Sequence, residues 1–282
     1  MSVIKTEPLL YDFIELCKKD PCSLPQWFMN QCKALCRPVK EIPDEMSPEE
    51  LQYLLLNHGL FDPGEWENLH DKVLELERID FWKVAEQEYH RLKAEWGGPE
   101  ASVYIFPVRK FHLPADERDM NKSGVSLKKC LFLFVAPDIQ LSEMKALLAH
   151  EYNHICRLSH LNLDERELPL KESIIMEGLA EYAVKHLYGK KLLAPWNFQT
   201  DNENGQEIFE KYYLPSLNLK GMHNHHQFLY GGEGTPIPKW GGYKIGFQIV
   251  AAYLEKQGSC PIQELLTKTA DEIISGAGFP IN

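Results

Sequence analysis

The sequence predicts an α+β protein in which a small mixed sheet lies between mostly helical N-terminal and C-terminal parts. Two short segments, 102–108 and 126–135, have the aromatic and β-branched composition of strands. Long stretches on either side of them repeat apolar residues at helical spacing. With 282 residues, of which 44% are hydrophobic, the chain can bury a substantial core as one large domain or two small lobes.

The first third of the chain is predicted to be helical. A capping-box sequence at 47–50 starts one helix, and a second, longer helix is expected from Asp62 to the Gly-Gly-Pro break at 97–99. Because this break ends the helical pattern, we place a domain boundary there. The prediction is a helical N-terminal region over 1–96 and a second domain over 97–282.

The second domain begins with the two strands and continues as helices. The strand at 126–135 is expected to be bounded by Gly124 and Pro137. Helical spacing then predicts four helices, over about 143–158, 170–187, 243–255 and 262–274.

Composition excludes several classes of function. The net charge of −11 and the absence of a basic stripe argue against a nucleic-acid partner. The N-terminus lacks the apolar core of an export signal, and no apolar run approaches the roughly 20 residues of a membrane span. Seven scattered cysteines without a C-x-x-C pair fit reduced thiols. We therefore expect a cytoplasmic protein with no membrane partner.

The pentapeptide 150–154, HEYNH, has the spacing of a metal site. A separation of four residues puts His150 and His154 on one face of a helix, where both can reach one zinc ion at roughly 2.1 Å. Glu151 lies one step round the helix and can contact a water on the metal. The alternative interpretation is an amphipathic core helix with two hydrogen-bonded histidines.

A catalytic zinc needs a third protein ligand, and His160 is one candidate. It stands ten residues after His150, but binding the same ion would require a sharp turn at Arg157, where a glycine would be suited. If the helix continues, His160 is rotated by about 240° from His154. It is then expected to be a solvent-exposed histidine near the helix end.

Glu177 is the other candidate, on the helix predicted over 170–187. A carboxylate from a second helix would give two histidines and one glutamate. Gly178 costs a helix roughly 1 kcal/mol relative to alanine, which suggests a close approach, and packing of two helices across a metal would explain it. Glu181 lies on the same face as Glu177 and could accept a hydrogen bond from a ligating histidine. The alternative is a helix with two solvated glutamates.

Three motifs in this order, HEYNH at 150–154, MEGLAEY at 176–182 and WGGYKIG at 240–246, resemble the gluzincins, zinc peptidases whose third ligand is a glutamate. The sequence is most similar to a family of predicted zinc-dependent proteases known as a domain of unknown function. The resemblance spans roughly 100–257. It implies a zincin-like fold in 97–282.

The resemblance also implies roles for particular residues. The zinc ligands would be His150, His154 and Glu177, with Glu151 as the catalytic base. Tyr243 is the first candidate for donating a hydrogen bond to the oxyanion, because it lies in the third motif. Tyr230 and the histidine-rich segment 223–226, which is expected to be a loop, offer competing donors.

These expectations together describe a zinc-dependent peptidase acting on a peptide or protein substrate. An extended substrate would lie along a sheet edge, and the strand that ends at Val135 is the expected edge because it directly precedes the metal helix. A zinc hydrolase of a non-peptide amide is one alternative. A non-catalytic, metal-binding regulatory protein is another, although it would have no need of Glu151.

Overall fold

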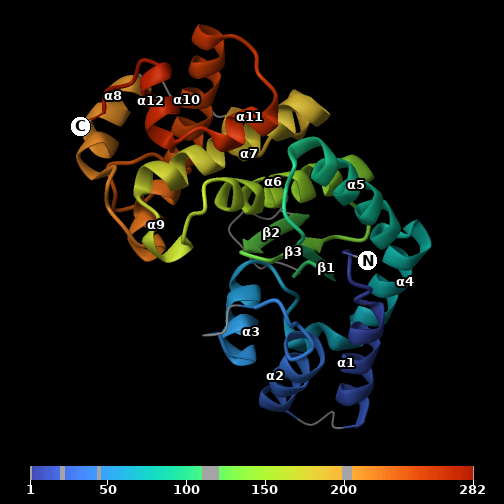
Figure 1. Cartoon of the computed structure of the whole chain (residues 1–282). Helices are drawn as coiled ribbons and strands as arrows, with labels where there is room; N and C mark the ends of the chain where they lie inside the picture. Colours follow the sequence, from blue (N-terminus) through green and yellow to red (C-terminus); the bar gives the residue numbers. More distant parts are fainter. Residues whose placement is uncertain (1, 20–22, 43–45, 110–120, 199–204, 282) are drawn as a thin grey trace. The chain divides into compact units, whose positions relative to one another are not determined.

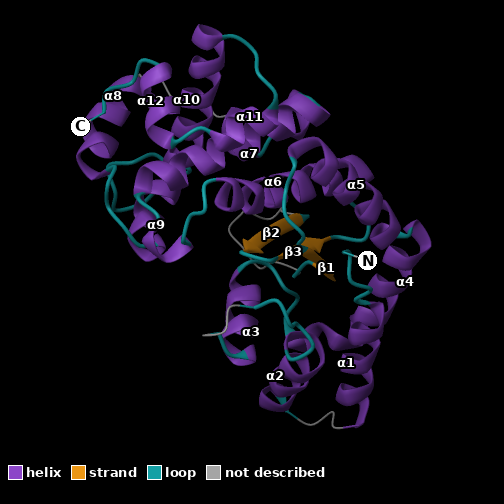
Figure 2. Ribbon diagram, in the orientation of Figure 1, coloured by secondary structure: helices purple, strands orange, loops and turns teal. Residues whose placement is uncertain are grey.

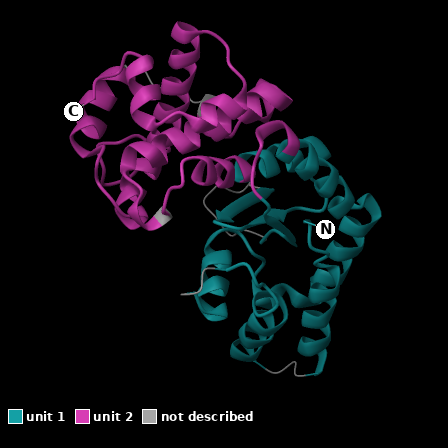
Figure 3. Ribbon diagram, viewed as in Figure 1, with its two compact units in different colours: residues 1–93, 100–151 teal, residues 94–99, 152–282 magenta. Residues whose placement is uncertain are grey.

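The computed structural model describes residues 2–19, 23–42, 46–109, 121–198 and 205–281, and Figure 1 traces the chain through them. Figure 2 shows many helices and one small sheet. The predicted α+β class with a small mixed sheet is confirmed. The chain divides into two compact units, residues 1–93 with 100–151 and residues 94–99 with 152–282 (Figure 3). The predicted boundary at 96/97 stays a prediction.

The N-terminal helices belong to the first unit, apart from the end of the last one. They are α1 (Glu7–Lys19), α2 (Leu24–Gln31), a π-helical turn (Cys32–Cys36), α3 (Pro48–Asn57), a 3₁₀ turn (Pro63–Asn68), α4 (Leu69–Ile79) and α5 (Phe81–Trp96). The capping box before α3 is present, because Ser47 and Glu50 each bond the other's backbone N–H. The single long helix expected from Asp62 is wrong: Asp80, with φ of 53°, breaks it into α4 and α5.

The sheet contains β1 (Ser102–Pro107), β2 (Lys122–Leu127) and β3 (Cys130–Val135), in the order β1-β3-β2. β1 runs parallel to β3 and β2 runs antiparallel to it. The expected strand over 126–135 is wrong, because a turn after Leu127 divides it, and Gly124 lies inside β2 instead of ending a strand. The expected edge is also wrong: β3 is central, and β2 is an edge strand.

The two faces of the sheet have different surroundings within the first unit. Phe132, Phe134 and Val125 pack with the N-terminal helices in one hydrophobic core. Alternation along β2 turns Lys122 and Gly124 to the opposite face. There Lys122 forms an ion pair with Glu143 of α6 (Leu141–His160), at 3.3 Å between Nζ and Oε1. β2 therefore lies against α6.

The unit boundary falls inside α6, and the helices that follow it belong to the second unit. They are α7 (Leu170–Tyr188), α8 (Gly205–Ile208), α9 (Met222–Tyr230), α10 (Gly241–Gln257), α11 (Ile262–Thr267) and α12 (Ala270–Gly276). Two expectations fail here: the histidine-rich segment 223–226 lies in helix α9, and two helices replace the one predicted over 262–274. No helix among the described residues is both long and apolar enough to cross a membrane.

Candidate metal centre

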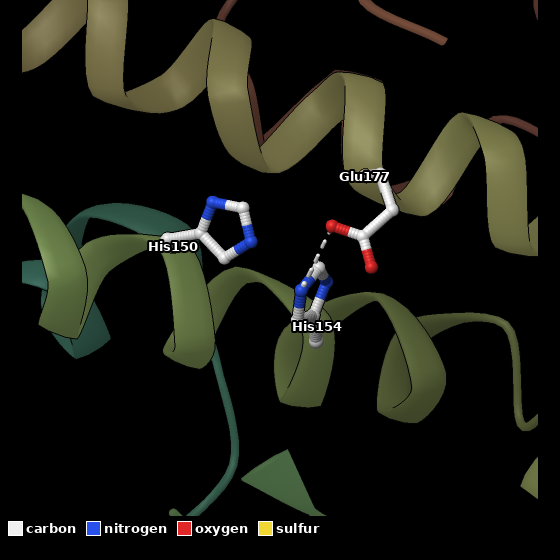
Figure 4. A group of neighbouring side chains, drawn as sticks. All are labelled: His150, His154 and Glu177. Carbon is white, nitrogen blue, oxygen red and sulfur yellow. Dashed lines mark ion pairs between the residues drawn. The ribbon is translucent and has the colours of Figure 1, made fainter. Parts of the chain in front are cut away.

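His150 and His154 project from successive turns of α6, and Glu177 projects toward them from α7 (Figure 4). Each residue offers one ligand atom, and these three atoms all lie within 4.8 Å of one another. His154 and Glu177 are buried, whereas His150 is half-buried. Among the described residues, this is the group of three or more such side chains that could hold a metal ion.

The separation of the donor atoms suits a metal better than a direct hydrogen bond. His154 Nε2 and Glu177 Oε2 are 3.6 Å apart, beyond the 2.7–3.2 Å typical of N–H···O bonds. Two ligands at about 2.1 Å from a tetrahedral zinc are separated by about 3.4 Å. Two imidazoles and one carboxylate also match the ligand types of catalytic zinc sites. The residues present therefore fit zinc.

Glu151 lies beside this group on α6, and its side chain is only 6% exposed. It packs against the backbone of Gly124 in β2, where a Cβ atom would lie 2.5 Å from Glu151 Oε1. The sequence did not predict this partner, because Gly124 is expected from sequence to bound a strand and not to lie inside one. The signal was a lone glycine inside the pattern Lys122 to Leu127, which often marks a close approach to a strand backbone.

Arg157 explains why α6 does not turn after the second histidine. Its guanidinium is fully buried, and it donates to the Glu172 carboxylate at 2.7 Å and to the Lys268 carbonyl at 3.0 Å. These bonds hold Arg157 inside a continuing helix. His160 ends that helix half-buried, with Nε2 3.0 Å from the Trp96 carbonyl oxygen. The expected solvent exposure of His160 is therefore wrong.

Gly178 does mark a close approach, but the approaching partner was predicted wrongly. A Cβ on Gly178 would collide with the backbone carbonyl of Gly246 in α10. The helix that requires the glycine is therefore α10, and the packing of α7 and α6 across a metal is not the reason for it. This contact lies directly beside Glu177 and fixes the turn of α7 that carries it.

Glu181 lies one turn beyond Glu177 and is buried, with 3% exposure. Its Oε2 accepts a hydrogen bond from the backbone N–H of Ala194 at 3.1 Å. The carboxylate therefore holds the segment that follows α7, which sequence analysis did not foresee. Its predicted role toward a ligating histidine stays a prediction.

Tyr243 lies in an aromatic cluster of the second unit. Its ring contacts Trp196, Tyr230 and Trp240, and its hydroxyl donates to the Tyr230 hydroxyl at 3.3 Å. Trp196 and Trp240 stack with their ring centroids 4.5 Å apart. Trp240 also has a left-handed backbone with φ of 61°, which is unusual for a bulky residue. The assignment of Tyr243 as the oxyanion donor stays a prediction.

His225 has a structural role within the histidine-rich segment. It is 1% exposed, its Nε2 lies 2.8 Å from the Leu219 carbonyl oxygen, and its Nδ1 lies 2.9 Å from Ser173 Oγ. Because a carbonyl oxygen only accepts, Nε2 carries the proton and Nδ1 accepts from the serine. Burial lowers the pKa of His225, so the neutral ring is favoured.

The fold and this His-His-Glu group define a candidate zinc site on an H-E-x-x-H helix. The chain belongs to the family described as Predicted Zn-dependent protease (DUF2268), whose model matches residues 81–275. The family resemblance inferred from the three motifs is thereby confirmed.

Two Bacillus subtilis (strain 168) proteins are similar to the chain. The uncharacterized protein YjaZ is 34% identical over 203 residues, which cover 71% of this chain and 76% of the relative. The uncharacterized protein YjfC is 25% identical over 147 residues, which cover 49% of this chain and 48% of the relative. No solved structure matches.

Proposed function

We propose that this protein is a zinc-dependent peptidase. The observation that carries the proposal is the convergence of His150, His154 and Glu177 beside a buried Glu151 on the same helix. Three protein ligands leave one position open, as catalytic zinc requires. Zinc bound there would supply Lewis acidity and a water of lowered pKa.

Glu151 provides the proton transfers of the proposed reaction. The carboxylate takes the proton of the attacking water and returns it to the leaving amine, since peptide hydrolysis needs a base and then an acid. Its position, one residue after His150, places it beside the ligands without making it one. A non-catalytic metal protein would have no use for this carboxylate.

The proposed substrate is an extended peptide. Among the described residues, β2 pairs only with β3, so its other edge can offer main-chain donors and acceptors to a peptide strand. β2 also packs against the helix that carries the candidate ligands. This proposal places the peptide on β2 instead of on the strand first expected.

Metal analysis paired with an activity assay tests the proposal. Protein purified without added zinc should contain about one zinc per chain, both in the parent and in Glu151→Gln, since the substitution leaves the three ligands intact. Only the parent should cleave a quenched-fluorescent peptide library. A parent without zinc would refute the proposal, and cleavage of small amides but no peptide would favour a hydrolase of another class.

A further inference from the structure

We propose that Gly124 is a positioning residue that sets the location of the Glu151 carboxylate. The inference rests on the proposed function, in which Glu151 is the base. It concerns a residue of the sheet that takes no part in holding the metal. Gly124 and Glu151 both belong to the first compact unit.

The geometry at Gly124 leaves no room for a side chain. A Cβ there would lie 2.5 Å from Oε1 and 2.7 Å from both Cδ and Cγ of Glu151. Carbon atoms in good contact are about 3.5–4.0 Å apart. An alanine would therefore have to displace the Glu151 side chain by about 1 Å along most of its length.

Neighbouring contacts prevent both the strand and the Glu151 side chain from moving aside. Gly124 is held in β2 by pairing with Leu133 of β3, and the Lys122–Glu143 ion pair ties the same strand face to α6. Glu151 is nearly fully buried, so its side chain has little free space to enter. Strand and carboxylate are thus fixed against each other, and the missing side chain is what allows the fit.

Backbone conformation gives no other reason for this glycine. Gly124 is absent from the glycines of positive φ, and it lies in a regular antiparallel ladder where any residue can adopt the conformation. Glycine within a strand weakens it, because it adds flexibility and has no side chain to pack. The close approach of Glu151 therefore accounts for its presence.

The first test is kinetic and uses Gly124→Ala in the full chain. With the library peptide that the parent cleaves best, kcat should fall about 100-fold with KM changed less than threefold, since a misplacement of about 1 Å has that effect on catalysis. Zinc should stay at one per chain. Lys128→Ala, at an exposed position in the turn that follows β2, is the control and should retain parental kcat.

The second test measures the contact without activity. Gly124→Ala should lower the midpoint of urea unfolding in the parent but much less in Glu151→Ala, where the colliding side chain is gone. If Gly124→Ala alone does not fold, the double variant should fold. Equal destabilisation in both backgrounds, or a double variant that also fails to fold, would overturn the proposed contact.

The outcomes separate this proposal from the proposed function. If the parent cleaves peptides and Gly124→Ala has a parental kcat, or a raised KM alone, the positioning role is refuted and the peptidase stands. If the parent cleaves no peptide, the proposed function fails, while the unfolding cycle still decides whether Glu151 requires a glycine at this position.

Discussion

Gly178 of α7 and Gly246 of α10 meet backbone to backbone. A Cβ on Gly178 would collide with the Gly246 carbonyl, and a Cβ on Gly246 would collide with the carbonyl of Ile174. Neither glycine has a positive φ, so the close helix contact, and not the local conformation, requires both. Helix α10 therefore fixes the turn of α7 that carries Glu177.

Gly178→Ala should destabilise the protein even though alanine favours a helix by about 1 kcal/mol. Forcing extra atoms into a packed contact costs about 1–3 kcal/mol, and here the obstacle is backbone. Urea unfolding should therefore show a lower free energy of unfolding than in the parent. His186→Ala, at an exposed position of the same helix, should change it by less than about 0.5 kcal/mol. A stabilised Gly178→Ala would contradict the prediction.

Glu177→Ala should weaken zinc binding by more than about 100-fold, because it removes one of the three proposed ligands. Changing a residue that only orients a ligand already lowers metal affinity by about 10–100-fold. Competition with a chelator measures the affinity. His160→Ala should keep the parental affinity, since the His160 ring nitrogen contacts Trp96. The opposite pattern would make His160 the third ligand.

Arg157→Met should lower the free energy of unfolding by about 3–5 kcal/mol, because it leaves the buried Glu172 carboxylate without its cation. Arg157→Met combined with Glu172→Gln removes both charges. This double variant should recover part of the lost free energy of unfolding, which urea unfolding measures. Arg166→Met, which breaks an exposed pair with Asp164, should cost at most about 1 kcal/mol. Similar losses for the buried and the exposed pair would show that burial is not the cause.

Stability should fall as the pH drops below about 6.5, and His225 should contribute to the loss. Its pKa is lowered in the folded protein, so the unfolded chain binds the proton first as the pH falls. The contribution of His225 to stability is fully present above the pKa of 6.5 that histidine has in the unfolded chain. It is lost as the pH falls toward the lower pKa of the folded protein. Thermal unfolding of the parent and of His225→Gln across pH 5–8 measures it. An unchanged pH dependence in the variant would exclude His225 as a source.

The elements that carry the candidate metal ligands were the most predictable from sequence. The pentapeptide 150–154 and Glu177 lie on long, strongly periodic helices, and the structure brings their candidate ligand atoms together. Local spacing was sufficient there, because a helix fixes which residues share a face. The turn that divides 126–135 was harder to predict from sequence, because the segments on both sides of it have the composition of strands.

The packing partners could not be predicted, because they depend on segments distant in sequence. Gly178 showed that some close approach was needed, but its own neighbours could not identify α10 as the partner. Arg157 was noted only as an unsuitable place for a turn, and its ion pair with Glu172 became visible with the fold. The same holds for Gly124 and Glu151, which are separated in sequence by strand β3 and the first half of α6.

The Glu172 carboxylate serves two elements at once, and this limits how far the chain can be shortened. One of its oxygens accepts from Arg157, and the other accepts the backbone N–H of Ala270 at the start of α12. A truncated protein that stopped after α10 would remove that amide and the Lys268 carbonyl to which Arg157 donates. The buried Arg157 guanidinium and the buried Glu172 carboxylate would then each lose one hydrogen-bond partner. The shortest chain that preserves the site must therefore extend through α12.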